Sequence, residues 1–306
     1  MFEYIQNFIN KISGFDINSL TSNPEFQNAV ETINSSLDLE DEKPSLFNVK
    51  PENIYALVIG IDYIKTPQLR LNGCVNDAFN MKEMLLNRFD VPNKNITILS
   101  DDNDAVLKEP TFKNIKNSML SLVDKAQNGD AKVIFVSYSG HGTQTPDSKK
   151  DADFEEDGKD ECWVPSDFRK AGLFKDDHIR KYLLEKLPEN TLCILISDSC
   201  HSGSMADLSL VYNPSTKLIK DTQTKIDNID ADIIQLSGCM DPQYAEELRI
   251  NGKISGVLSH CLTQYLKKNK NIRQIVDESN ELCRKLKLSQ IPLVSVNKSE
   301  LFDIVL

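Results

Sequence analysis

The sequence predicts an α/β protein with a mostly parallel central sheet and helices on both faces of that sheet. Short apolar runs alternate along the chain with longer segments whose apolar residues recur three or four positions apart. The run at 54–61 (IYALVIGI) is continuously apolar and ends at a turn, which is typical of a strand buried on both faces. Strand, helix and strand in repetition indicate a parallel sheet with helical crossovers.

The individual elements follow in order from about residue 53. The first helix would place Ala78, Met81, Leu85 and Phe89 on one face, and Thr111 stands where it would cap the next helix. The expected strands cover 54–61, 96–99, 133–138, 192–196, 233–237 and 292–296. The expected helices cover 78–89, 111–122, 179–187, 258–266 and 275–286. A chain of 306 residues with these elements can form one large α/β domain or two smaller ones.

Two regions fall outside this pattern. Residues 1–52 are polar and patchy, apart from apolar residues at 5, 8, 9 and 12 that would suit one short amphipathic helix. We interpret this region as an N-terminal segment with a pro- or regulatory role. Residues 212–230 are polar and contain lysines, and we expect them to form an exposed loop.

Composition and charge restrict the class of partner. The formal net charge of −11 argues against nucleic acid, because phosphate binding needs a basic surface, but it is compatible with basic peptides or cations. The longest apolar run is far shorter than the roughly 20 residues that cross a bilayer, and the N-terminus lacks the basic start of a secretory signal. Seven cysteines without a CxxC pair favour free thiols in a reducing compartment. We therefore expect a cytoplasmic protein with neither a membrane nor a nucleic-acid partner.

Chemically active residues follow two of the expected strands. The strand at 133–138 runs into Ser139-Gly140-His141-Gly142, and the strand at 192–196 runs into the motif DSCHSG, which contains Cys200. In an open parallel sheet, ligands bind beyond the carboxyl ends of the strands. If these two strands are neighbours, His141 and Cys200 lie at the same edge of the sheet.

This pairing predicts a thiol nucleophile with an imidazole partner. A thiol with a pKa of roughly 8.5 needs a base, and an imidazole can take its proton and later return it to a leaving amine. The main-chain amides of Gly140 and Cys200 are candidate oxyanion donors. The alternative interpretation is a buried Cys200 and a hydrogen-bonded turn residue at 141, and His201 is a rival base.

Five motifs support a resemblance to a known family. They are LNGCVND (71–77), YSGHGTQT (138–145), DECWVPSDF (160–168), DSCHSGS (198–204) and LSGCMDPQYAEE (236–247). With these motifs the chain resembles the metacaspases, which are caspase-like cysteine peptidases of clan CD. The resemblance implies a caspase–hemoglobinase sandwich, with a large p20-like subdomain at 53–211, a processing loop at 212–230 and a small p10-like subdomain at 231–306. The short loop resembles type I members.

The resemblance also implies cleavage after Arg or Lys. Asp198, Asp77, Ser139 and Cys74 match the positions that form the primary specificity pocket in the family, and paired carboxylates suit a guanidinium or an ammonium. We call these four the P1 residues, because P1 is the substrate residue before the cleaved bond. An alternative role for Asp77 is the N-cap of the helix that follows.

Calcium is the cofactor that the resemblance implies. Four aspartates match the family's calcium-binding positions: Asp160, Asp176, Asp177 and Asp207. Carboxylate oxygens from separate segments are what Ca²⁺ requires, although without the resemblance these acids would be taken for surface charges.

Self-processing is a further hypothesis. A peptidase that cleaves after basic residues could cut its own lysines in the exposed segments, namely Lys217, Lys220, Lys225 and Lys50. The resemblance implies a monomer that acts on basic peptide or protein substrates. Two alternatives are a caspase-like scaffold that binds basic peptides without cleaving them, and a legumain-like or paracaspase-like enzyme of the same clan.

Overall fold

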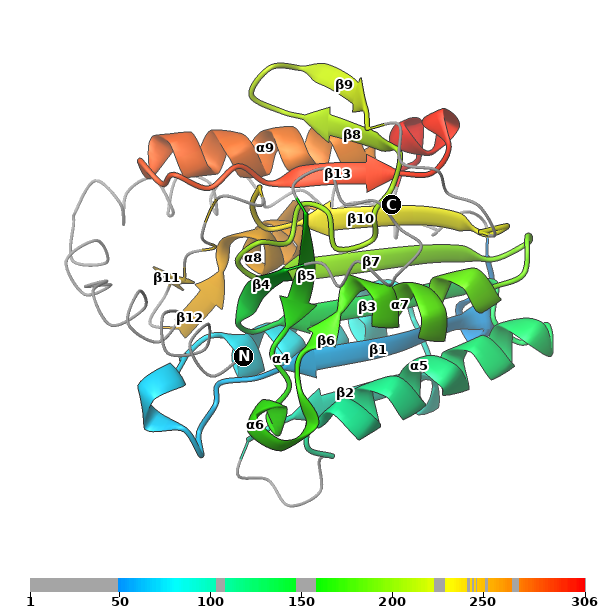
Figure 1. Ribbon diagram of the computed structural model, residues 1–306. Coiled ribbons are helices and arrows are strands. Elements are labelled where there is room, and N and C mark those ends of the chain that lie inside the picture. The colour runs from blue at the N-terminus through cyan, green and yellow to red at the C-terminus, as the bar shows by residue number, and fades with distance from the viewer. Residues whose placement is uncertain are drawn as a thin grey trace.

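A central sheet organises the chain. The computed structural model describes residues 49–102, 108–146, 158–222, 229–240, 243, 245, 247–250, 253–265 and 270–305. Within these residues, eight strands form one sheet in the order β2-β1-β3-β7-β10-β13-β8-β9 (Figure 1). The strands are β1 (Ile54–Gly60), β2 (Ile96–Ser100), β3 (Val133–Ser139), β7 (Leu192–Asp198), β8 (Leu210–Asn213), β9 (Leu218–Asp221), β10 (Asp232–Ser237) and β13 (Leu293–Val296). The strands from β2 to β10 are parallel, and β13, β8 and β9 continue the sheet in antiparallel pairing.

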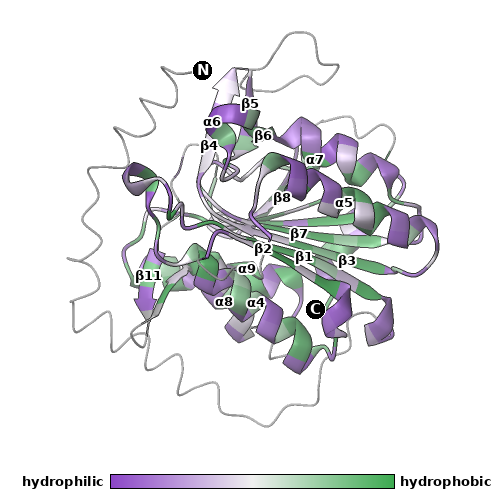
Figure 2. Cartoon of the chain, turned by 90° about the horizontal axis from the view of Figure 1, so that it is seen from below, coloured by the Kyte–Doolittle hydropathy of each residue, from purple (hydrophilic) through white to green (hydrophobic). Residues whose placement is uncertain are grey.

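Helices cover both faces of this sheet, as Figure 2 shows. One face packs against α4 (Cys74–Arg88), α8 (Val257–Tyr265) and α9 (Ile272–Lys285), and the other against α5 (Phe112–Gln127) and α7 (Asp176–Tyr182). Alternate residues of β1 enter the two cores, because successive side chains of a strand point to opposite faces. The predicted fold class is therefore confirmed.

A second, three-stranded sheet lies beside the carboxyl ends of β3 and β7. It contains β4 (Gly142–Pro146), β5 (Lys159–Trp163) and β6 (Phe174–Lys175), and the four-residue helix α6 (Phe168–Ala171) lies between β5 and β6. Trp163 attaches it to the central sheet: its ring stacks on Tyr138 at 4.5 Å, and its Nε1–H donates to Ser197 Oγ at 2.9 Å. These three strands were missed in the sequence because they are short and largely polar.

A hairpin of β11 (Glu247–Ile250) and β12 (Lys253–Gly256) precedes α8. Its first residue, Glu247, reaches the N-terminus of α4, where its Oε1 accepts hydrogen bonds from the main chain of Asn72 and Gly73. The hairpin therefore connects the last third of the chain to the first helix of the sheet.

Most predicted elements have the expected positions. Thr111 caps α5 as expected, since its side chain accepts a hydrogen bond from the Asn114 amide at 3.2 Å. The helix expected at 179–187 begins earlier, at Asp176, and ends at Tyr182. A 3-10 turn at Leu184–Lys186 follows it.

The expectation of an exposed loop at 212–230 is wrong at its start. Tyr212 lies in β8, which pairs with β13 inside the central sheet, and its side chain is buried in the core. The polar character of the segment reflects β9, whose residues are all exposed. The expected helix near the N-terminus and the lysine at 225 lie outside the described residues. No helix within the described parts of the chain combines the length and apolarity needed to span a membrane.

Candidate active site

Parallel pairing of β3 with β7 brings the two chemically active segments together. Ser139 and Asp198 are partners in the register, so His141 and Cys200 each follow two residues beyond a paired position. The main chains then touch: a Cβ at Gly142 would lie 1.8 Å from the main-chain oxygen of Cys200. Only glycine permits this approach. The expectation that the two strands are neighbours is confirmed.

His141 is fixed by the loop after β1 and by two tyrosines. Its Nε2–H donates to the Leu69 carbonyl at 2.8 Å, since a carbonyl oxygen can only accept. Its amide donates to Tyr63 Oη at 3.0 Å, and Tyr138 Oη donates to its carbonyl at 2.7 Å. With the proton on Nε2, the basic lone pair is on Nδ1. Burial lowers the pKa of His141 from 6.5 to about 4, because desolvation disfavours the imidazolium.

Cys200 differs from the other cysteines in its exposure. None of the seven forms a disulfide; six are buried, and Cys200 is partly exposed. Its Sγ lies 3.9 Å from the Ala245 carbonyl. The next residue, His201, has a φ of 50° and donates its amide to the Gln243 carbonyl at 3.4 Å. A partly exposed thiol at a strand end is the environment expected of a reactive cysteine.

Two aspartates of the P1 residues are held where β12 runs directly into α8. Asp77 Oδ2 accepts from the Gly256 amide at 2.9 Å, and its Oδ1 accepts from Ser255 Oγ. Asp198 Oδ2 accepts from the Ser259 amide at 2.8 Å, and Ser259 Oγ is 3.2 Å from Ser139 Oγ. The structure therefore connects Asp77, Asp198 and Ser139 through one short segment.

The N-cap role considered for Asp77 is wrong. The helix begins earlier, at Cys74, and the N-cap position is Gly73. The first amides of the helix, those of Cys74 and Val75, donate instead to Asp62 Oδ1 at 2.9 and 3.3 Å. Asp77 is therefore not needed to cap α4, and its carboxylate is held by the Ser255–Gly256 segment.

Burial of the Asp77 and Asp198 carboxylates carries an electrostatic cost. Desolvation raises the pKa of Asp77 and of Asp198, and the charge of Asp198 raises that of Asp77 further. Asp198 Oδ1 is buried and, among the described residues, has no hydrogen-bond partner. Because a buried anionic oxygen without a donor is costly, this position favours a cationic ligand.

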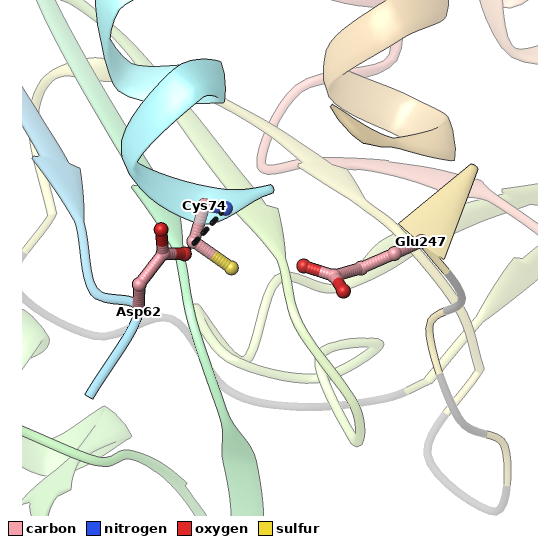
Figure 3. A group of neighbouring side chains, drawn as sticks. All are labelled: Asp62, Cys74 and Glu247. Atoms are coloured by element: carbon pink, nitrogen blue, oxygen red, sulfur yellow. Dashed lines mark hydrogen bonds between the residues drawn. The ribbon is translucent and has the colours of Figure 1, made fainter. Parts of the chain in front are cut away.

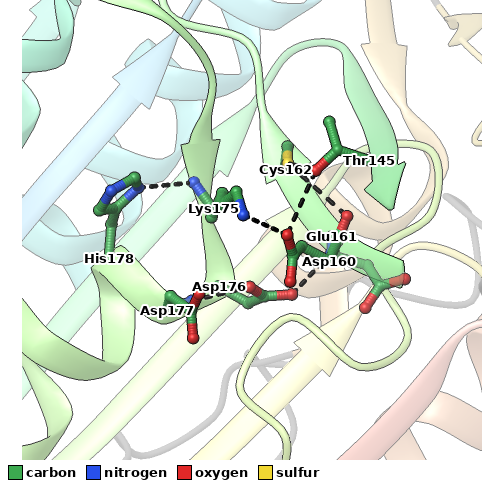
Figure 4. Close-up of polar contacts among 8 residues, drawn as sticks. All are labelled: Thr145, Asp160, Glu161, Cys162, Lys175, Asp176, Asp177 and His178. Atoms are coloured by element: carbon green, nitrogen blue, oxygen red, sulfur yellow. Dashed lines mark hydrogen bonds and ion pairs between the residues drawn. The ribbon is translucent and has the colours of Figure 1, made fainter. Parts of the chain in front are cut away.

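Three of the four predicted calcium ligands form a cluster. Carboxylate oxygens of Asp160, Asp176 and Asp177 lie within 4.8 Å of one another, at the start of β5 and the start of α7 (Figure 4). Asp176 is held in place by the Glu161 amide at 2.6 Å and the Asp177 amide at 2.7 Å. The Lys175 ammonium forms an ion pair with Asp160.

Asp207 is not part of that group of three. It lies in the turn after Cys200 with a φ of 49°, and its amide donates to the Ser204 carbonyl at 2.8 Å. Ser204 Oγ in turn donates to Glu161, a buried neighbour of the cluster. The turn that carries Asp207 is thus attached to β5, although the carboxylate itself stays outside the group.

Several residues at the site were not found from the sequence. They are Asp62, the Leu69 carbonyl, Glu161, Lys175 and Glu247. Asp62 had a usable signal, because it follows directly after the apolar run of β1. A main-chain carbonyl carries no signal in the sequence, and Glu247 reaches α4 only through the β11–β12 hairpin.

The lysines proposed for self-processing lie in different settings. Lys217 is in the β8–β9 turn and forms an ion pair with Asp277 at 2.6 Å. Lys220 is exposed in β9, and Lys50 is exposed just before β1.

Comparison with known sequences identifies relatives. A family model for the metacaspase peptidase C14 domain matches residues 55–209. Metacaspase-1 of Plasmodium falciparum is 35% identical over 225 residues, which cover 72% of this chain and 35% of that protein. Metacaspase-3 of Trypanosoma brucei brucei is 30% identical over 283 residues, which cover 86% of this chain and 76% of the relative. The chain therefore spans about a third of the first relative and about three quarters of the second.

Solved structures share the fold. A protein from Geobacter sulfurreducens matches with a TM-score of 0.56 at 21% identity, over 82% of this chain and 97% of that one. Caspase-1 from Spodoptera frugiperda matches with a TM-score of 0.50 at 11% identity, over 84% and 93% respectively. Taken with the family model and the curated relatives, these likenesses show that the chain belongs to the metacaspase family of caspase-like cysteine peptidases.

Proposed function

We propose that this chain is a cysteine endopeptidase that cleaves peptide bonds after Arg or Lys. The observation that carries the proposal is the pairing of β3 with β7, which places a partly exposed thiol and an oriented, neutral imidazole beside buried carboxylates. Calcium dependence and self-processing are parts of the same proposal.

In the proposed reaction, His141 Nδ1 accepts the thiol proton and Cys200 Sγ attacks the carbonyl carbon of the scissile bond. The amides of Gly140 and Cys200 donate to the oxyanion that forms. The protonated imidazole then gives its proton to the leaving amine, and a thioester remains on Cys200. Water activated by the neutral imidazole hydrolyses the thioester and regenerates the thiol. The Leu69 carbonyl keeps the ring in the tautomer that this cycle needs.

Arg or Lys at P1 is supported by the charge around Asp198. Its Oδ1 is buried without a donor among the described residues, and Asp77 adds a second carboxylate nearby. A substrate cation would offset one of these two charges, whereas an acidic P1 side chain would add a third buried negative charge. Cys74 and Ser139 complete the proposed P1 residues.

Calcium binding is supported by the chemistry of the acidic cluster. Asp160, Asp176 and Asp177 offer hard oxygen ligands from two elements, which fits Ca²⁺. When bound, calcium would neutralise these carboxylates and cross-link β5 to α7. We propose Asp207 as a further ligand, which would require its turn to move towards β5. Lys175 now compensates part of the negative charge through its ion pair with Asp160.

We further propose that the chain acts as a cytoplasmic monomer and cuts itself at exposed lysines. All seven cysteines are free of disulfides, as expected of a reducing compartment. The β13 strand is already paired with β8, so β13 is not an open edge, and the edge on that side is the short, exposed strand β9. Lys220 and Lys50 are supported as cut sites by their exposure, whereas Lys217 is engaged by Asp277. Lys225 lies outside the described residues.

Replacing Asp198 by Asn should lower kcat/KM for Arg and Lys peptides by at least about a hundredfold, since losing one partner of a buried ion pair costs roughly 3–5 kcal/mol. Fluorogenic peptides with Arg, Lys, Asp or Asn at P1, assayed with calcium and with a chelator, measure this. Asp130→Asn, in an exposed turn, is the matched control. Unchanged kinetics for Asp198→Asn, or cleavage after Asp by the wild type, would contradict the P1 assignment.

His141 should remain neutral far below the usual pKa of an imidazole. In a Cys200→Ala variant we expect the ring to keep its proton on Nε2 and to become protonated only below about pH 5, because burial disfavours the cation. Nitrogen chemical shifts across a pH titration report both the tautomer and the midpoint. A midpoint at or above 6.5, the ordinary pKa of a histidine, would show that the imidazole is not the buried neutral base described above.

Replacing Lys175 by Met should tighten calcium binding several-fold, because the ammonium no longer competes for Asp160. Calorimetric titration of calcium into the Cys200→Ala background measures the affinity without self-cleavage. Lys181→Met, on the exposed side of the same helix α7, should leave the affinity unchanged. Equal or weaker calcium binding by the Lys175 variant would show that calcium does not use Asp160.

A further inference from the structure

Buried side-chain oxygens without a hydrogen-bond partner among the described residues lie on both faces of the central sheet. On the face of α4 and α8 they belong to Asp198 and to Glu247, whose carboxylate points towards Cys74 of the P1 residues (Figure 3). On the opposite face, Oε1 of Gln235 is buried in the same way. This second case has no part in the reaction proposed above.

Gln235 interrupts an apolar strand in the interior of the sheet. The strand β10 (DIIQLS) pairs with β7 on one side and with β13 on the other, and Gln235 is 0% exposed. Because successive side chains of a strand alternate, Gln235 lies on the same face as Ile233, in the core beneath α5 and α7. Strands buried on both faces are ordinarily apolar, so an amide at this position needs hydrogen-bond partners.

The partners of Gln235 lie at the turn that follows Cys200. Its Nε2 donates to the Ser202 carbonyl at 2.7 Å and to Ser237 Oγ at 2.7 Å, and it lies 3.4 Å from the Gly203 carbonyl. Ser237 Oγ donates to the same Ser202 carbonyl at 2.7 Å. Two side chains of β10 thus hold one carbonyl that lies two residues after Cys200.

The orientation of the Gln235 amide follows from these partners. Carbonyl oxygens only accept, and the Ser237 hydroxyl spends its proton on the Ser202 carbonyl, so all three partners need a donor. The Nε2 group therefore faces the turn, and Oε1 is left without a donor in the described part of the chain. A methionine or leucine would fill the position without burying that oxygen. The cost of the buried oxygen is thus tied to the hydrogen bonds that Nε2 makes.

The main-chain hydrogen bonds next to Cys200 are longer. His201 has a φ of 50°, a left-handed conformation that a residue other than glycine keeps only when its surroundings hold it. Its amide donates to the Gln243 carbonyl at 3.4 Å, and the Met205 amide donates to the Ser202 carbonyl at 3.5 Å. The 2.7 Å bonds from β10 are therefore the closer attachment of this turn to the sheet.

We propose that Gln235 is a positioning residue, which sets the direction of the Cys200 thiol and main-chain amide by holding the Ser202 carbonyl. It acts through the turn and does not touch the substrate. In the proposed reaction the thiol attacks and the amide donates to the oxyanion, and a displacement of about 1 Å can slow such a step about a hundredfold. The effect on catalysis rests on the proposed function, whereas the attachment of the turn to Gln235 does not.

Gln235→Met tests this role, because methionine matches the length of glutamine but cannot donate a hydrogen bond. For the full chain with calcium and an Arg peptide, we expect kcat to fall more than about tenfold and KM to change less than about twofold, since the P1 carboxylates lie on the opposite face of the sheet. The midpoint of thermal unfolding should not fall, because the substitution removes an unpartnered oxygen.

Hydrogen exchange reports the turn without relying on activity. In the Cys200→Ala background, which prevents self-cleavage, Gln235→Met should speed exchange in the peptide that contains residues 200–206 and leave the other strands unchanged. Thr191→Val is the matched control. It removes another buried, unpartnered oxygen just before β7, at the end of that strand away from Cys200, and should leave both kcat and exchange as in the wild type.

Gln235→Glu separates positioning from filling of the core. A protonated carboxyl can donate to the Ser202 carbonyl and a carboxylate cannot, and burial raises the pKa of such a group. The kcat of this variant relative to the wild type should therefore recover as the pH falls from about 8.5 to about 5.5.

Unchanged kcat in Gln235→Met, or a turn that exchanges at the wild-type rate, would overturn the positioning role. A Gln235→Glu activity ratio that does not vary with pH would overturn it as well. A wild type that cleaves neither Arg nor Lys peptides would instead contradict the proposed function, and the exchange of residues 200–206 would still decide whether Gln235 holds the turn.

Discussion

The parallel pairing of β3 with β7 is the constraint on which the site depends. Ser139 is paired with Asp198, and this register places His141 and Cys200 each two residues beyond the last paired position. A slip of one residue would turn the side chains of one strand to the opposite face. The two buried cores hold this register, because alternate residues of each strand are committed to opposite faces. The geometry of the proposed catalytic pair is thus a consequence of how the sheet packs.

Negative charge is concentrated at two places that the same sheet positions. Around α4 and α8, main-chain amides stabilise Asp62, Asp77, Asp198 and Glu247, yet two of their oxygens remain without donors in the described residues. In the second sheet, the acidic cluster is compensated in part by Lys175. Buried carboxylates of this kind lower the stability of the fold at neutral pH, since their raised pKa values favour protonation. A bound cation would offset the negative charge of these carboxylates and so reduce that cost. This holds for a basic substrate side chain and for a metal ion.

The sequence was sufficient to predict the parallel sheet, the helices and the proximity of His141 to Cys200, because continuous apolar runs and glycine-flanked motifs are local signals. It was insufficient for β4–β6, whose short polar strands are held by stacking of Trp163 on Tyr138. The N-cap role of Asp77 failed because the start of α4 was placed too late, and Asp62 takes that role. Glu247 joins the site through a hairpin far along the chain, a contact that only the folded structure reveals.

We propose that Cys200, supported by His141, attacks peptide bonds that follow a basic residue. Treatment of the calcium-loaded protein with a peptidyl acyloxymethyl ketone ending in Arg, followed by peptide mapping in a mass spectrometer, tests it most directly. We expect a single adduct on Cys200, formed much more slowly in His141→Ala and not formed by the matching probe that ends in Asp. An adduct on any other cysteine, or equal labelling by the Asp probe, would contradict it.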